Sequence, residues 1–72
     1  MAITINFDDS SWDEDFVIEN LPLASKVTDA GETWITFECA AWCYNSDCAK
    51  CLERLETDLL RHGDPVASID RR

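Results

Sequence analysis

The sequence predicts an α+β domain in which a three- or four-stranded antiparallel sheet is covered on one face by one C-terminal amphipathic helix. Three observations lead to this fold. Apolar and polar residues alternate in two segments, apolar residues recur at helical spacing over 46–62, and a glycine follows that run. A sheet and a helix that are each apolar on one side bury those sides against each other. A chain of 72 residues is expected to form a single domain, 1–72.

The sheet is expected over residues 2–39, and its clearest strands lie at the two ends of that range. In residues 2–7, the apolar positions alternate with polar ones, as in a half-buried strand. Residues 32–39 alternate in the same way. The side chains expected to face the core are Ile3, Ile5, Phe7, Ile35, Phe37 and Cys39. Those expected on the opposite side of the second strand are Trp34, Thr36 and Glu38.

The middle of the sheet region carries weaker signals. Residues 8–15 form a polar acidic loop, and a second extended segment is expected to begin at Phe16-Val17-Ile18. Pro22 interrupts this segment or places it on a sheet edge. The strand can then continue over 23–27. Thr28 to Gly31 is expected to be a turn in which the glycine adopts a positive φ.

The helix over 46–62 has a signal at each end. Asn45 or Ser46 can cap its start by accepting a backbone N–H bond, and Gly63 with Pro65 ends it. Residues 66–72 are expected to be a loose tail. The apolar face of the helix comprises Cys48, Cys51, Leu52, Leu55 and Leu59.

Charge is the strongest functional signal in the composition. Fifteen acidic residues and six basic ones give a net charge of −9. Such a balance repels nucleic acids and anionic membranes, and it favours partners with basic surfaces. Residues 1–38 contain nine acids and a single base, Lys26. The expected partner-contact residues are therefore Asp8, Asp9, Asp13, Glu14, Asp15, Glu19, Asp29, Glu32 and Glu38.

Four cysteines, Cys39, Cys43, Cys48 and Cys51, lie within 13 residues. Zinc prefers such soft ligands, but only four residues separate the two pairs and the last pair falls in the predicted helix. Buried thiols are the main prediction, with no metal and no cofactor. Zinc coordination is the first alternative, and redox chemistry is the second.

The acidic loop does not fit a calcium-binding EF-hand. In the register that starts at Asp9, Glu14 occupies the position of the required glycine and Asn20 that of the required glutamate. Two interpretations remain: a solvated loop that maintains solubility, or a surface that imitates nucleic-acid phosphates. Trp12 and Trp34 are either packed against the sheet or exposed as interface anchors, and packing is favoured.

No catalytic constellation is recognisable, so the chain is predicted not to be an enzyme. The single histidine, His62, lies at the helix end, where a positive charge favours the helix dipole. The sequence contains two glycines and no phosphate loop or dinucleotide fingerprint. There is neither a signal peptide nor an apolar run of about 20 residues, so a cytoplasmic location is expected.

In size, acidity, compactness and lack of enzymatic motifs, the chain resembles small phage-encoded inhibitors of bacterial immunity. The closest class is the DNA-mimic anti-CRISPR proteins, followed by anti-restriction proteins. The resemblance implies a monomer in the host cytoplasm that covers the DNA-binding groove of a CRISPR surveillance complex or nuclease. It implies no direct binding to nucleic acid or membrane. The alternative function is a small zinc-stabilised or apolar protein-interaction adaptor.

Overall fold

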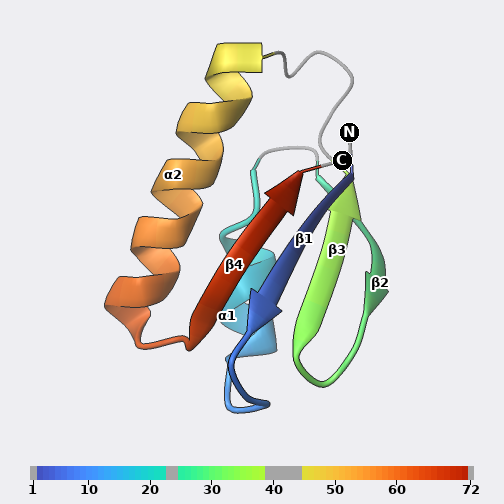
Figure 1. The fold of residues 1–72 in the computed structure, drawn as a ribbon, viewed down its shortest axis with the longest axis vertical. Coiled ribbons are helices and arrows are strands. Elements are labelled where there is room, and N and C mark those ends of the chain that lie inside the picture. Colours follow the sequence, from blue (N-terminus) through green and yellow to red (C-terminus); the bar gives the residue numbers. More distant parts are fainter. Residues whose placement is uncertain (1, 23–24, 39–44, 72) are drawn as a thin grey trace.

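The computed structural model describes residues 2–22, 25–38 and 45–71, and for residues 45–50 it describes the backbone alone. This part of the chain contains four strands and two helices in the order β-α-β-β-α-β (Figure 1). Its elements are β1 (Ala2–Phe7), α1 (Glu14–Glu19), β2 (Lys26–Ala30), β3 (Trp34–Glu38), α2 (Asn45–His62) and β4 (Val66–Arg71).

The strands form one antiparallel sheet in the order β2-β3-β1-β4. In Figure 1, α1 lies behind the sheet, α2 runs along the side of β4, and neither helix lies in front. A β-α-β-β-α-β chain with this strand order has the split β-α-β, or ferredoxin-like, topology. The α+β class is thus confirmed. Because this topology carries many unrelated activities, function has to be argued from particular residues.

The prediction of a loose tail over residues 66–72 is wrong, and so is the prediction that the helix is the C-terminal element. Residues 66–71 form β4, so α2 lies in the middle of the chain. Register shifts by one residue between Asn6 and Phe7 of β1, which leaves Ala67 as an extra residue in β4. The bulge explains why the alternation was missed, because Val66 and Ile69 are three residues apart and yet both pack against the core.

The segment predicted to be extended from Phe16 is instead the short helix α1. Asp13 caps it, since its carboxylate accepts the backbone N–H of Phe16 at 3.1 Å. Glu14 and Asp15 in the first turn are favourable to the helix dipole. Val17 then becomes fully buried. The cap and the acidic first turn outweigh the strand preference of the apolar residues that follow.

Strand β2 occupies residues that were predicted to be a turn. Lys26 pairs with Glu38 and Ala30 with Ile35, so the connection to β3 lies two to three residues later than predicted, at 31–33. Gly31 also differs from expectation, because its φ is not positive. A Cβ at this position would lie 2.5 Å from the Trp34 indole. Gly31 is therefore needed for close approach of that ring.

The hydrophobic core lies between the sheet and the two helices, and its sheet side was predicted correctly. The helix prediction is confirmed for its leucines and wrong for Cys51, which is exposed. Cys39, Cys43 and Cys48 lie outside the described residues or side chains, as do the proposed capping side chains of Asn45 and Ser46. The buried apolar residues are Ile3, Ile5, Phe7, Trp12, Val17, Ile35, Phe37, Leu52, Leu55 and Leu59.

The predicted end of α2 at Gly63 is confirmed. This glycine has a φ of 98°, a conformation that strains other residues. Its N–H donates to the carbonyl of Leu60 at 3.1 Å, and the N–H of Asp64 donates to that of Leu59 at 3.0 Å. These two bonds form a Schellman motif. The motif reverses the chain and delivers it to the start of β4.

Candidate acidic binding surface

Three chain connections meet at the lower end of the molecule in Figure 1: residues 8–13, 31–33 and 63–65. Two backbone bonds join them. The N–H of Phe7 donates to the carbonyl of Thr33 at 2.8 Å, and the N–H of Asp8 donates to that of Pro65 at 2.8 Å. These segments, distant in sequence, therefore form one continuous surface.

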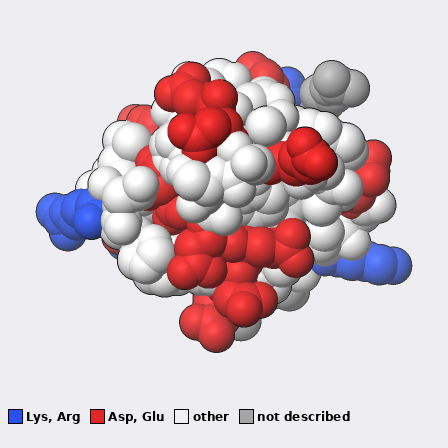
Figure 2. Space-filling model, turned by 90° about the horizontal axis from the view of Figure 1, so that it is seen from below, with Lys and Arg blue, Asp and Glu red and all other residues white. Residues whose placement is uncertain are grey.

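This surface is strongly acidic, and we call it the acidic end. No Lys or Arg occurs in residues 8–15 or 31–33. Figure 2 views the molecule from this side: carboxylates cover much of its middle, and Lys and Arg project only at its margins. The side chains of the acidic end are all exposed, and they belong to Asp8, Asp9, Asp13, Glu14, Asp15 and Glu32.

Three further residues predicted to contact a partner lie outside this group. Glu19 is the last residue of α1, Asp29 lies on the edge strand β2, and Glu38 ends β3 at the opposite end from the 31–33 connection. Of the nine predicted residues, Asp29 and Glu38 are the two in strands. The nine acids therefore do not form one face of the sheet, and residues 8–15 do not have the regular spacing of a strand.

Trp12 holds the acidic end in place from within. Its ring is 8% exposed and stacks on Phe7, with centroids 4.3 Å apart and planes 4° from parallel. Its indole N–H donates to the carbonyl of Glu32 at 2.7 Å. The expectation that Trp12 packs is confirmed. Because this one side chain bonds across two connections, it fixes the acidic loop relative to the turn that carries Glu32.

A second anchor is the buried carboxylate of Asp64, which is 5% exposed. One oxygen accepts the backbone N–H of Asp13 at 2.8 Å, and the other lies 3.2 Å from His62 Nδ1. The imidazole stacks on Phe16 with centroids 3.7 Å apart, and its Nε2 lies 3.9 Å from a carboxylate oxygen of Asp13. The end of α2 is thereby joined to the start of α1.

Sequence reasoning missed the role of Asp64, which lies between Gly63 and Pro65, the two residues that predict the helix end. His62 likewise acts through contacts with α1 rather than simply through the helix dipole. A histidine that is oriented by a carboxylate can act as the general base that activates a nucleophile. Within the described residues, however, His62 makes hydrogen-bond contact with no Ser, Thr or Cys side chain. The observed contacts support a clasp between two helix ends.

The acidic loop contains a local turn that orders its first carboxylates. Asp9 accepts the backbone N–H of Ser11 at 2.8 Å and also the Ser11 hydroxyl. These two bonds lower the pKa of Asp9 below its usual range, and the bond from the hydroxyl has the larger effect. Asp9 therefore stays ionised to lower pH than an ordinary aspartate.

A shallow hollow opens at the acidic end between the two connections that Trp12 joins. It has a volume of about 330 Å³ and is lined by Ser10, Trp12, Glu14, Gly31 and Glu32. Glu14 and Glu32 come from different segments and border the same space. The acidic end is thus concave at this point, with carboxylates on both sides.

The described residues contain no group of three or more His, Cys, Asp or Glu side chains placed to hold a metal ion. Cys51 is exposed and lies on α2. The zinc alternative depends on Cys39, Cys43 and Cys48 as well, whose side chains are not described, so it stays a prediction. In the part of the chain that is described, no helix is long and apolar enough to cross a membrane.

Comparison with known proteins finds no matching family model, no matching curated protein and no matching solved structure. The acidic end is therefore the feature from which a function can be inferred.

Proposed function

We propose that this protein is a small acidic inhibitor that occupies the nucleic-acid-binding surface of a basic partner protein. The observation that carries the proposal is the acidic end: six exposed carboxylates, with no Lys or Arg among residues 8–15 or 31–33. A protein that binds DNA or RNA lines its groove with Lys and Arg. Carboxylates held at the right place can take the position of the phosphates there.

Rigidity is the second support for this function. A flexible acidic loop would lose conformational entropy on binding, and that loss weakens affinity. Here the loop is held by the Trp12 stack and hydrogen bond, by the Asp9–Ser11 turn and by the bond from Asp13 to Asp64. The backbone that carries the carboxylates is therefore held in place before any partner arrives.

The partner class follows from the chemistry and from the resemblance to DNA-mimic inhibitors. We take it to be a CRISPR surveillance complex or nuclease, with a restriction enzyme as the next candidate. The inhibitor acts as a monomer that binds no nucleic acid itself. Its net charge of −9 opposes both self-association through the acidic end and contact with DNA.

The test is a competition experiment with purified CRISPR surveillance complexes and restriction nucleases, each loaded with fluorescent DNA. The protein is expected to displace DNA from at least one of them. Displacement should weaken steeply between about 50 and 200 mM salt. The carboxylates contact Lys and Arg as phosphates do, and such contacts release counterions on binding, which added salt opposes. An apolar adaptor would bind with little dependence on salt. If no basic partner releases DNA, or if displacement is insensitive to salt, the proposal is wrong.

A further inference from the structure

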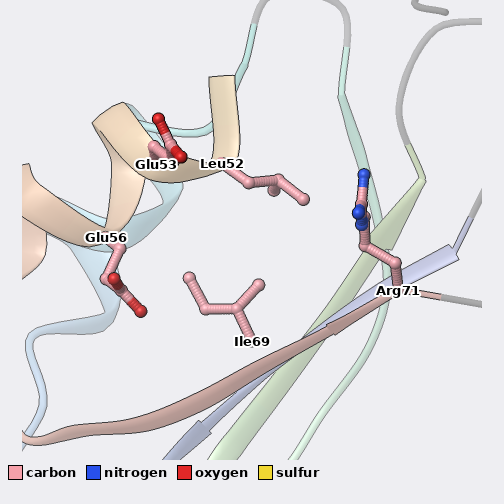
Figure 3. A pocket seen from close by; sticks show the side chains of 5 residues that line it. All are labelled: Leu52, Glu53, Glu56, Ile69 and Arg71. Carbon is pink, nitrogen blue, oxygen red and sulfur yellow. The ribbon is translucent and has the colours of Figure 1, made fainter. Parts of the chain in front are cut away.

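A second hollow lies away from the acidic end, between α2 and β4. It has a volume of about 230 Å³ and is lined by Leu52, Glu53, Glu56, Ile69 and Arg71. Figure 3 shows the side chains of Leu52 and Ile69 projecting into the space between the helix and the strand. Glu53 and Glu56 border it from α2, and Arg71 borders it from the end of β4. The hollow thus has an apolar floor and charged sides.

The charged groups around this floor are not paired with one another. Within the described residues, the ion pairs closer than 4.0 Å all involve His62. Glu53, Glu56 and Arg71 are exposed, so each carries its charge in water beside the hollow. The helix side is therefore negative and the strand end positive. A ligand that matches both would carry a cation and an anion in a fixed order.

The strand beside the hollow is an edge of the sheet. Strand β4 pairs with β1 on one side and with no described strand on the other. An edge strand offers backbone N–H and C=O groups to an added extended segment. Ile69 and Arg71 are two residues apart on β4, which is the spacing of side chains on one face of a strand. An added segment would therefore place two alternate side chains of its own beside them.

We propose that the hollow between α2 and β4 binds an extended segment of a partner protein. The segment carries a Lys or Arg and an acidic residue two positions apart, and either of them can come first in its sequence. The basic side chain packs its aliphatic stem on Leu52 and Ile69, and its charged end lies beside Glu53 and Glu56. The acidic side chain lies beside Arg71. Backbone bonds to the edge of β4 hold the segment extended.

A peptide segment fits this hollow better than a free small molecule does. Small-molecule sites have volumes of about 300–1,000 Å³ and enclose most of the ligand. This hollow is smaller, and one of its walls is the edge strand β4. The inference does not depend on the proposed function, because none of its lining residues belongs to the acidic end.

The experiment uses three acetylated and amidated peptides added to the isotope-labelled full chain, with backbone amide shifts recorded by NMR. The sequences are Thr-Thr-Lys-Thr-Asp-Thr-Thr, the same peptide with Lys in place of Asp, and the same peptide with Asp in place of Lys. We expect shifts in β4 and around residues 52–56. We expect the lysine–aspartate peptide to bind about twofold to fivefold more tightly than the other two, as one or two exposed ion pairs allow.

Two variants test which charges of the hollow contribute to peptide binding. The double variant Glu53→Gln, Glu56→Gln should weaken the lysine–aspartate peptide by about twofold to fivefold, and Arg71→Ser should abolish its advantage over the dilysine peptide. As a matched control, Glu14→Gln with Glu32→Gln removes two carboxylates at the acidic end and should change neither result. All these side chains are exposed, so the fold should be preserved.

If the peptides bind only through a general attraction to the negative charge of the protein, the dilysine peptide should bind best. That order would overturn the proposal, as would shifts confined to the acidic end or no binding of any peptide. Concentration-dependent shifts in β4 without peptide would show that a second copy of this chain occupies the edge, and would overturn it as well.

Discussion

The buried carboxylate of Asp64 accepts a hydrogen bond from the backbone N–H of Asp13 at 2.8 Å, across 51 residues of sequence. Asp13 in turn caps α1 through its own side chain. The same Asp64 side chain lies 3.2 Å from the imidazole of His62 at the end of α2. One buried acid therefore connects the turn before β4 to the start of the helix that carries part of the acidic end.

Replacing this acid should destabilise the fold. Asp64→Ala leaves the partly buried N–H of Asp13 without its acceptor, so we expect the free energy of unfolding to fall by about 1–3 kcal/mol. Asp64→Asn keeps an acceptor oxygen of the same shape and should lose less. Urea unfolding measures both. Asp58→Ala, which alters a partly exposed acid on α2 that makes no such bond, is the control and should stay within about 0.5 kcal/mol. Equal losses for Asp64→Ala and Asp58→Ala would contradict the role of Asp64.

Trp12 combines an aromatic stack with a hydrogen bond, and two substitutions separate them. Trp12→Phe can keep the stack on Phe7 but loses the bond to the Glu32 carbonyl, which should cost about 1 kcal/mol. Trp12→Ala loses both and should cost about 3–5 kcal/mol. Thermal or urea unfolding gives the two values. If Trp12→Phe is as damaging as Trp12→Ala, the stack contributes little and the account of this anchor is wrong.

Gly31 and Gly63 are needed for different reasons, and a double-mutant cycle can distinguish them. Gly31→Ala should cost about 1–3 kcal/mol, because the new methyl group would meet the Trp34 indole. In a Trp34→Ala background this cost should largely disappear. Gly63→Ala should cost about 1 kcal/mol in either background, since its strain comes from the positive φ of 98°. An unchanged cost of Gly31→Ala without the indole would refute the steric explanation.

The pKa of Asp9 offers a test of the local turn. Ser11→Ala removes the hydroxyl bond and keeps the backbone bond, so the pKa of Asp9 should rise part of the way to its usual value. Because folding lowers the pKa of Asp9, its ionised form favours the folded state above the usual aspartate pKa. This contribution is lost as pH falls through the lowered pKa. Carboxyl NMR titration measures the change, and Ser10→Ala should leave the pKa of Asp9 as it was.

The elements predicted best from the sequence were those whose pattern arises within one segment. Alternation identified the buried side of β1 and β3, and helical spacing with Gly63 identified α2 and its end. These signals need no knowledge of the neighbouring strands, since each follows from the geometry of a single element. The packing of Trp12 was also anticipated, because a large indole is costly to leave among exposed acids.

The features that were missed depend on partners distant in sequence. Strand β4 was hidden because a bulge at Ala67 breaks its alternation, and the bulge is visible only against β1. Helix α1 was hidden because its apolar residues favour strands; its cap from Asp13 to Phe16 is local, but Asp13 itself is held by the distant Asp64. All six acids of the acidic end are among the nine predicted contact residues: five lie within residues 8–15, and the fold brings Glu32 to them.

We propose that the acidic end, rather than charge in general, contacts a basic partner. The most direct measurement is the affinity of a DNA-releasing partner for two variants with equal charge change. One is Asp8→Lys, Glu14→Lys, Glu32→Lys, and the other is Glu19→Lys, Glu38→Lys, Asp58→Lys. At about 1 kcal/mol for each contact, the first variant should bind about 100-fold more weakly, and the second should stay within about threefold. Equal weakening of the two variants would contradict the claim.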